Sequence, residues 1–151
     1  MANGRPTIAS AIFYRDPRGA IELLKAAFGF ELVTLIETPD GNLAHSQMAL
    51  DGATIMVGGE WMADVASPAS VGGKNTQFIH IHIAGDIDAH CEQARAAGMT
   101  ITQEPQDQFF GDRTYRCKDP EGHMWVVAQT VKTVTREEAE AATGFKITGW
   151  A

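Results

Sequence analysis

Short runs of apolar and β-branched residues open two similar segments of the chain. Residues 7–14 (TIASAIFY) and 77–84 (QFIHIHIA) are rich in β-branched and aromatic side chains, as β-strands are. Each run leads to an aspartate, Asp16 or Asp86, and then to apolar residues at helical spacing. The pattern therefore predicts a strand followed by a helix in each segment.

The two predicted helices cover residues 17–28 and 87–97 and end in the same way. A glycine follows each of them, Gly29 in the first and Gly98 in the second. Glycine is common at this position because the residue that ends a helix often adopts a left-handed conformation. The second helix is one residue shorter than the first at its glycine.

Three strand-like runs follow each helix, and turn-forming residues separate them. The predicted strands are residues 31–37, 43–50 and 53–57 in the first half and 100–104, 113–118 and 123–130 in the second half. Pro-Asp-Gly, Asp-Gly and Asp-Pro-Glu-Gly sequences between the runs are typical of tight turns. The chain is therefore predicted to contain two β-α-β-β-β modules, offset by 70 residues between Asp16 and Asp86.

We predict one domain that contains both modules. Its four parts are module one (7–58), a Gly-, Ser- and Pro-rich linker (59–76), module two (77–131) and a C-terminal extension (132–151). Thr135 and Glu138 have the spacing of a capping box, which predicts one further helix at about 136–143.

Charge and hydropathy exclude several classes of partner. A net charge of −7 without a basic run disfavours nucleic acid, because phosphate binding needs clustered Lys and Arg. No segment approaches the roughly 18 apolar residues that span a membrane, and the opening MANGRPTIAS lacks the apolar core of a signal peptide. We expect a cytoplasmic protein that binds neither nucleic acid nor membrane, with Cys91 and Cys117 as reduced thiols.

Three stretches of the chain resemble the glyoxalase/bleomycin-resistance/dioxygenase superfamily, also called vicinal oxygen chelate. They are residues 16–29, GDIDAHCEQARAAGMTI (85–101) and EPQDQFFGDRTYRCKDPEGHMW (104–125). The resemblance covers roughly residues 7–131 and is to the bacterial glyoxalase-like or phosphonate-operon-like branch. It implies an α+β fold in which the tandem modules form a curved mixed sheet around a cleft, with a C-terminal helix added. It also implies a small-molecule ligand in that cleft and a homodimer.

The resemblance further implies a divalent metal held by the first and last strand of each module. Counting from Asp16, Asp86 and Asp119 places the family's ligand positions at Ala9, Ile79, Val126 and Met56. None of these four side chains is a ligand for a hard cation, so we predict no metal cofactor. An alternative is a divalent metal such as zinc or iron bound by His45, His80 and His82, since alternation in FIHIHIA places His80 and His82 on one face.

Candidate ligand-binding residues follow from alternation and from the repeat. His45 and Gln47 share one face of their predicted strand, and Tyr115 and Cys117 lie 70 residues after them. Pseudo-symmetry therefore predicts that these four residues face one cleft, unless they form cross-strand pairs without a ligand. We add His82 and two aromatic residues of the flanking loops, Trp61 and Phe110, as further candidates.

Two functions follow from these alternatives. The chain is predicted to be a glyoxalase/bleomycin-resistance-like protein that binds a small organic molecule between its modules without the usual metal. The alternative is a metal-dependent lyase, isomerase or dioxygenase with a non-standard histidine site. Within the predicted set of His45, Gln47, Tyr115 and Cys117, His45 would also be able to act as a base near neutral pH. Whether the protein is an enzyme stays open at this stage.

Overall fold

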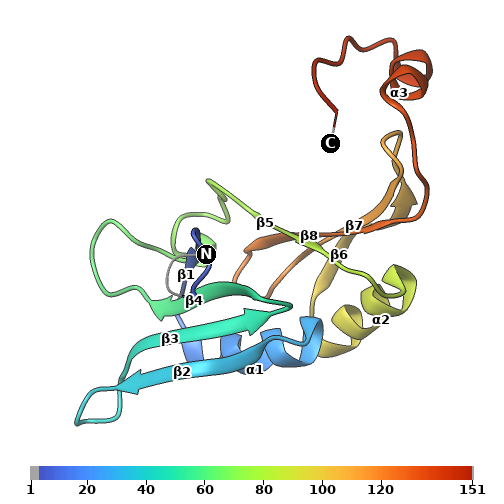
Figure 1. Ribbon diagram of the computed structural model, residues 1–151. Helices are drawn as coiled ribbons and strands as arrows, with labels where there is room; N and C mark the ends of the chain where they lie inside the picture. The colour runs from blue at the N-terminus through green and yellow to red at the C-terminus, as the bar shows by residue number, and fades with distance from the viewer. Residues whose placement is uncertain (1–3, 151) are drawn as a thin grey trace.

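The computed structural model describes residues 4–150, and these residues form two four-stranded sheets and three α-helices. In chain order the elements are β1 (Ser10–Tyr14), α1 (Pro17–Phe28), β2 (Glu31–Glu37), β3 (Leu43–Leu50), β4 (Ala53–Gly59), a short 3₁₀ helix (Pro68–Ser70), β5 (Ile79–His82), α2 (Ile87–Ala97), β6 (Thr100–Asp107), β7 (Asp112–Lys118), β8 (Met124–Thr130) and α3 (Arg136–Thr143). The β-α-β-β-β order occurs twice, which confirms the predicted α+β fold of tandem modules (Figure 1).

Both sheets have the same strand order. The first runs β1-β4-β3-β2 and the second runs β5-β8-β7-β6. In each sheet the first strand of the module pairs in parallel with the last, and the other neighbours are antiparallel. Sequential hairpins account for the antiparallel pairs, whereas the parallel pair needs the long connection that includes the helix. The strands β1 and β5 thus form one edge of each sheet.

The helices begin and end where the sequence predicts. The carboxylate of Asp16 accepts a hydrogen bond from the amide of Gly19, and that of Asp86 accepts from Asp88 and Ala89. Both glycines that follow a helix are left-handed, with φ of 80° at Gly29 and 112° at Gly98. In α3 the predicted capping box between Thr135 and Glu138 is present.

Strand ends differ more from the prediction than helix ends do. The strands β1 and β5 are shorter than the predicted runs 7–14 and 77–84, whereas β6 extends past residue 104 to Asp107. The backbone hydrogen bonds of a helix are formed within the helix, but those of a strand are formed with the neighbouring strand, so a strand ends where this pairing ends. The limits of β6 are therefore set by its pairing with β7.

One hydrophobic core joins the two modules. The helices α1 and α2 pack against each other and against the sheets (Figure 1). Trp125 of β8 is fully buried, and its ring lies 5.1 Å from that of Phe28 and 6.2 Å from that of Phe30. Phe28 and Phe30 belong to module one, whereas Trp125 belongs to module two. Separating the modules would therefore expose the core that they share.

The buried carboxylate of Asp119 connects β1 to the turn between β7 and β8. Its Oδ2 accepts hydrogen bonds from the Tyr14 hydroxyl at 2.7 Å and from Trp125 Nε1 at 3.3 Å. Its Oδ1 accepts from the backbone amides of Glu121 and His123. Burial raises the pKa of Tyr14, and the Asp119 carboxylate raises it further, so the phenol stays a hydrogen-bond donor.

The same turn holds the backbone of β1 directly. The Glu121 carboxylate accepts from the amides of Arg15 and Asp16 at 2.6 and 2.9 Å. His123 Nε2 lies 2.7 Å from the carbonyl oxygen of Phe13. The Asp-Pro-Glu-Gly-His sequence therefore forms a clasp between the modules, which we call the Asp119 clasp and define as residues 119–123 with the end of β1.

The C-terminal arm, residues 131–150, extends away from both sheets (Figure 1). The start of the arm is held by Gly111, which lies just before β7. The carbonyl oxygen of Gly111 accepts hydrogen bonds from the amides of Val131 and Lys132, and the φ angle of Gly111 is 98°. Within the arm, Trp150 Nε1 donates to the carbonyl of Val134. The Phe145 ring of the arm lies 6.1 Å from the ring of Phe109 in the loop between β6 and β7. None of the helices in residues 4–150 combines the length and the apolar character that a bilayer crossing requires.

We predict that Asp119→Ala lowers the free energy of unfolding by about 3 kcal/mol or more, because two buried side-chain donors and two amides lose their acceptor. Tyr14→Phe removes one hydrogen bond to a charged group and should cost about 1.5 kcal/mol. The control is Asp64→Ala at an exposed aspartate, with an expected change within about 0.5 kcal/mol. Urea unfolding at constant m-value measures all three, and a loss below 1 kcal/mol in Asp119→Ala would contradict the clasp.

Candidate functional site

Each sheet has one face against its helix and one open face. On the helix side the fully buried side chains include Ser46 and Met48 in module one and Val127 in module two. The residues between them point the other way, because side chains alternate along a strand. The open faces of both sheets are the largest surfaces that the core does not use, and two hollows lie on them.

The first hollow lies on the open face of module one and has a volume of about 420 Å³. Its floor and sides are mainly hydrocarbon and aromatic. The side chains that line it include those of Phe13, Leu43, His45, Met56 and Trp61. Trp61 is 74% exposed at the rim, so its indole ring is accessible to a ligand.

Glu60 contributes a carboxylate to the lining of the first hollow, but this carboxylate already accepts hydrogen bonds from the linker. Its oxygens accept hydrogen bonds from the Ser70 hydroxyl and from the backbone amide of Ser67. These two bonds lower the pKa of Glu60. The carboxylate therefore fixes the linker at the rim.

The second hollow lies on the open face of module two and has a volume of about 350 Å³. Its lining residues come from β5 and the segment just before it, from β7 and the loop before it, and from β8. They are Phe78, His80, Gln108, Phe110, Thr114, Arg116, Met124 and Val126. This hollow has an apolar floor and, unlike the first, a guanidinium group in its lining.

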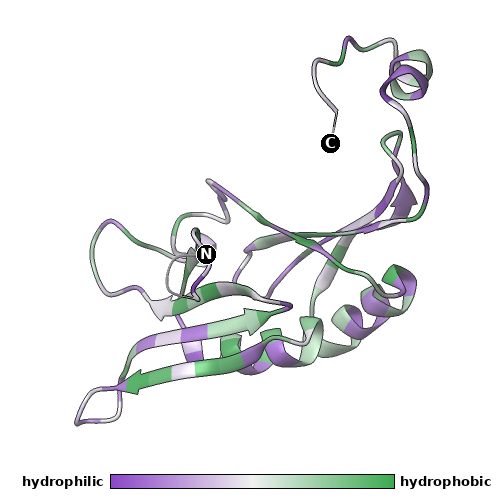
Figure 2. Cartoon of the chain, viewed as in Figure 1, coloured by the Kyte–Doolittle hydropathy of each residue, from purple (hydrophilic) through white to green (hydrophobic). Residues whose placement is uncertain are grey.

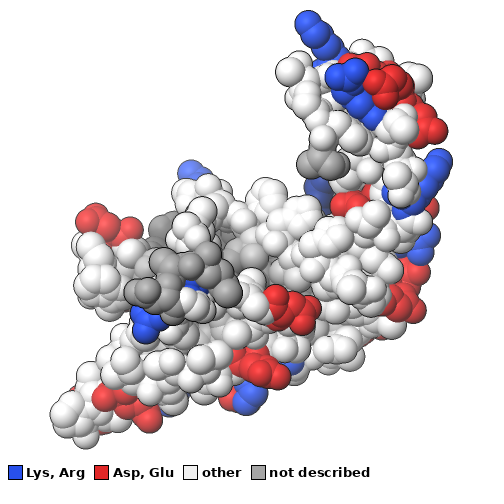
Figure 3. Space-filling view, in the orientation of Figure 1, with Lys and Arg blue, Asp and Glu red and all other residues white. Residues whose placement is uncertain are grey.

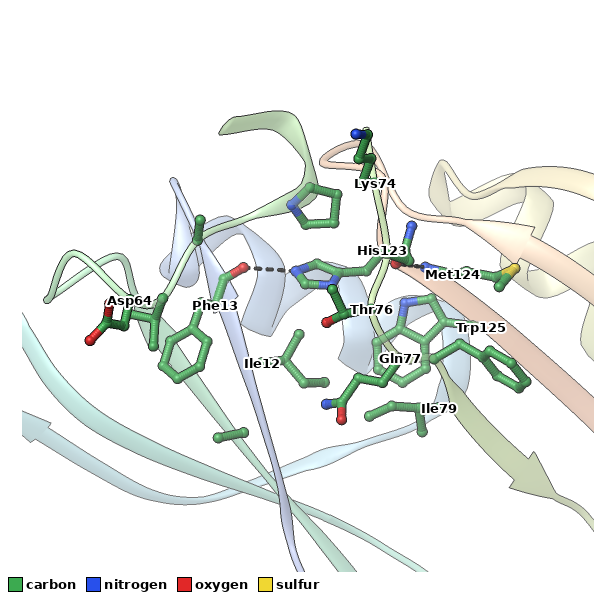
Figure 4. Close-up of a pocket in the computed structure, with 16 residues that line it drawn as sticks. Ile12, Phe13, Asp64, Lys74, Thr76, Gln77, Ile79, His123, Met124 and Trp125 are labelled. Atoms are coloured by element: carbon green, nitrogen blue, oxygen red, sulfur yellow. Dashed lines mark hydrogen bonds between the residues drawn. The ribbon is translucent and has the colours of Figure 1, made fainter. Parts of the chain in front are cut away.

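A narrower crevice of about 300 Å³ separates the edges of β1 and β5. Figure 4 shows the His123 ring directed at the carbonyl of Phe13, with Thr76 and Gln77 beside the opening. Asn75 spans this region, since its amide donates to the carbonyl of Gly122 and its oxygen accepts from the amide of Met124. The crevice is bounded by the Asp119 clasp, and its His123 side chain is used to hold the modules together.

Alternation in β3 and β5 has the predicted sense. His45 and Gln47 are half-buried on the open face, while Ser46 and Met48 are fully buried on the other. In β5 the isoleucines pack toward the core and His80 and His82 are exposed on the open face. His80 lines the second hollow, whereas His82 lies beyond it, with Nε2 at 3.1 Å from Thr130 Oγ1 and 3.7 Å from Asp112 Oδ2.

The predicted facing of Tyr115 and Cys117 is wrong. Both side chains are fully buried on the helix side of β7, and the Tyr115 hydroxyl lies 2.8 Å from Nδ1 of His90. Burial raises the pKa of Cys117 to about 12. The structure therefore brings His45 and Gln47 together but leaves Tyr115 and Cys117 on the opposite side of the other sheet.

Strand pairing explains the error. Gln47 pairs with Met56 in module one, and Arg116 pairs with Val126 at the corresponding place in module two. His45 therefore corresponds to Thr114 and not to Tyr115. The shorter second helix shifts the following strands by one residue, and the longer Asp119–His123 turn restores the original offset. A shift of one residue exchanges the two faces of a strand.

Comparison with known proteins is consistent with this geometry. The profile of the glyoxalase/bleomycin resistance protein/dioxygenase superfamily matches residues 7–127. The chain belongs to this superfamily. It is 32% identical over 148 residues to the uncharacterised protein Rv0887c of Mycobacterium tuberculosis, which covers 93% of this chain and 84% of that protein.

Several solved structures are similar to this chain in fold. TioX from Micromonospora sp. ML1 superposes with a TM-score of 0.64 at 27% identity, over 83% of this chain and 98% of that one. TnmS3 from Streptomyces sp. CB03234, described as an antibiotic binding protein, gives a TM-score of 0.63 at 18% identity, over 86% of this chain and 98% of that one. The second likeness shows the fold alone.

The superfamily's metal does not fit the side chains on the open faces. In β1 and β4 the paired residues are Ala11 and Met56, and in β5 and β8 they are His80 and Val126. Ile79, one of the positions reached by counting, is paired with Trp125 on the helix side. One imidazole among hydrocarbon and thioether groups is not a donor set for a divalent ion, which needs several oxygen or nitrogen ligands.

The alternative set of His45, His80 and His82 is not assembled either. Within residues 4–150, one group of three potential ligand atoms lies within 4.8 Å, and it is Cys91, Glu92 and Glu104. Cys91 of this group is buried in the core, and both exposed glutamates already pair with Arg95. His45 lines the first hollow, and His80 lines the second.

Trp61 lines the first hollow and Phe110 lines the second. The residues that sequence reasoning missed are Phe13, Phe78 and Arg116. Arg116 had a usable signal, because an arginine between the apolar or aromatic Tyr115 and Cys117 has to point away from the core. Carrying the one-residue shortening of the second helix into β7 would have placed it on the open face.

We predict that neither cysteine of the native protein reacts with a thiol reagent such as 5,5′-dithiobis(2-nitrobenzoate) at pH 8. With a pKa near 12, the thiolate fraction of Cys117 at this pH is about 10⁻⁴, and both thiols are inaccessible. Two thiols should react after unfolding in guanidinium. As a positive control, Gln47→Cys on the open face should add one fast-reacting thiol. Rapid labelling of Cys117 in the native protein would contradict its placement on the buried, helix-side face of β7.

Proposed function

We propose that this protein binds a small, largely apolar organic molecule on the open faces of its modules, without the metal centre of its superfamily. One observation carries the proposal: hydrocarbon and aromatic side chains line the hollows and replace the chelating groups. Met56 and Val126, at two of the family's ligand positions, form part of the floor of the first and second hollow. Such concave, mostly apolar surfaces with a few polar groups are typical of small-molecule sites.

The polar groups of the first hollow suit recognition. The imidazole of His45 provides a hydrogen-bond donor and an acceptor above an apolar floor. Trp61 and Phe13 flank it, so a planar ligand would find an aromatic surface on which to stack. Burial of such a ligand would also cover Trp61.

Relatives support binding at the level of the superfamily. TnmS3, which has this fold, is described as an antibiotic binding protein. Charge gives independent support for an uncharged or weakly charged organic ligand over a polyanion. The chain has a net charge of −7, and acidic and basic side chains are interspersed on the face shown in Figure 3, whereas nucleic-acid sites are strongly basic.

We also propose that the protein is a homodimer. The edge strand β2 exposes four apolar side chains, Leu32, Val33, Leu35 and Ile36, at 38 to 62% of their surface. This apolar strand is visible at the lower edge of the molecule in Figure 2. An exposed apolar edge strand favours association, and a second copy is the partner that the superfamily suggests.

The uncharged fluorophore N-phenyl-1-naphthylamine should bind with enhanced emission and a Kd on the order of 0.1 mM or tighter. Met56→Lys should weaken binding about tenfold or more, because the ligand would bury a charge on the floor of the first hollow. Val71→Lys replaces an apolar residue that is 47% exposed in the linker and should leave the titration unchanged. Absence of binding to the unmodified protein would contradict the proposal.

Metal analysis separates this function from the metal-dependent alternative. Protein purified without an affinity tag should contain far less than one divalent ion per chain, and chelator treatment should change neither Tm nor probe affinity. A ligand that binds only the folded state raises its stability. A stoichiometric ion whose removal lowers Tm would therefore overturn the metal-free proposal.

Light scattering after size exclusion should give twice the mass of one chain. Replacing two exposed residues of β2 in the double variant Val33→Lys, Ile36→Lys should shift the mass toward one chain, because like charges would oppose each other at a two-fold interface. A mass of one chain for the unmodified protein at all concentrations would contradict the dimer.

A further inference from the structure

The open face of module two carries a row of side chains that differs chemically from module one. Arg116 pairs with Val126 across β7 and β8, and Val126 pairs with His80 across β8 and β5. Directly opposed residues point to the same side of a sheet. A guanidinium and an imidazole therefore flank one apolar residue, and all three line the second hollow.

Arg116 differs from the other arginines between residues 15 and 136 because its guanidinium forms neither a hydrogen bond nor an ion pair with the residues that the structure describes. Between residues 15 and 136, each of the remaining arginines forms a hydrogen bond or ion pair; they are Arg15, Arg18, Arg95, Arg113 and Arg136. No carboxylate within residues 4–150 lies within 4.0 Å of the Arg116 guanidinium. In a chain with a net charge of −7, an unpaired arginine in a lined hollow is available to a ligand.

The nearby acidic and amide groups are engaged elsewhere. Asp112 accepts a hydrogen bond from Thr130 and lies next to His82. The side-chain amides of Gln103 and Gln108 donate to Thr114. These contacts hold the strand on either side of Arg116 and leave its five N–H donors unused.

The floor under this cation is apolar. Met124 and Val126 of β8 form it, and Phe78 and Phe110 lie at its sides. A guanidinium binds a carboxylate through two parallel hydrogen bonds, and His80 offers a further donor. An inorganic anion would use the guanidinium but none of the hydrocarbon, so the floor favours a ligand with an apolar body.

We propose that the second hollow is a subsite for the carboxylate of an aromatic or aliphatic organic acid, with Arg116 as its anchor. The proposal rests on the proposed function and specifies the class of ligand. The body of the acid lies on Met124 and Val126, and its carboxylate pairs with Arg116 beside His80.

The test compares 2-naphthoate with its uncharged analogue 2-naphthamide by isothermal titration calorimetry at low salt. The acid should bind about tenfold more tightly than the amide, because only the acid can form a charge-assisted bidentate contact with Arg116. Arg116→Met keeps an apolar stem and should remove this preference while changing amide affinity less than twofold. Arg116→Lys should restore part of it, because the charge remains without the bidentate geometry.

Arg18→Met is the matched control, since it removes one positive charge at an arginine that pairs with Glu37 far along the chain from β7; it should leave the preference intact. Equal affinity for the acid and the amide, or a preference for the acid that survives Arg116→Met, would overturn the carboxylate subsite. If the uncharged fluorophore still binds in that case, the proposed function itself stands. If neither naphthalene compound nor that fluorophore binds, the proposed function fails together with this inference.

Discussion

The buried carboxylate of Asp119 is the constraint on which the arrangement of the two modules depends. It accepts four hydrogen bonds, from a phenol, an indole and two backbone amides. Tyr14 belongs to module one and the other three donors to module two. Because a buried carboxylate without donors is very unfavourable, the modules are held in the single arrangement that satisfies it. The crevice between β1 and β5 is lined by residues of both modules and depends on that arrangement.

The two faces of each sheet have different roles, since the helix-side face forms the core and the open face carries the candidate site. The helix-side faces form the shared core, in which Trp125 packs against Phe28 at the end of α1 and against Phe30 just beyond it. Stability is therefore provided by side chains that a ligand never touches. The open faces can vary without loss of the fold, and here they carry an apolar and aromatic hollow in one module and a hollow with an arginine in the other. A ligand that spans both would be oriented by charge at one end.

The repeat made most of the fold predictable. Asp16 and Asp86 start the helices and Gly29 and Gly98 end them for local reasons, namely capping and left-handed geometry, so these limits were correct to the residue. The facing of His45 and Gln47 was also predictable, since Met48 and Ser46 alternate with them. Tyr115 and Cys117 were placed on the wrong face because one deletion in α2 and one insertion after β7 cancel over the whole module but not between them.

The sequence alone determined the two modules, the helix limits, the alternation along β3 and β5, and the absence of chelating side chains at Met56 and Val126. These features depend on neighbours in the chain or on residue type. Only the tertiary structure decided which face of β7 is buried, that Asp119 joins both modules, and that Arg116 lies across Val126 from His80. Those depend on strand register and on contacts between residues up to 105 positions apart, which no local pattern specifies.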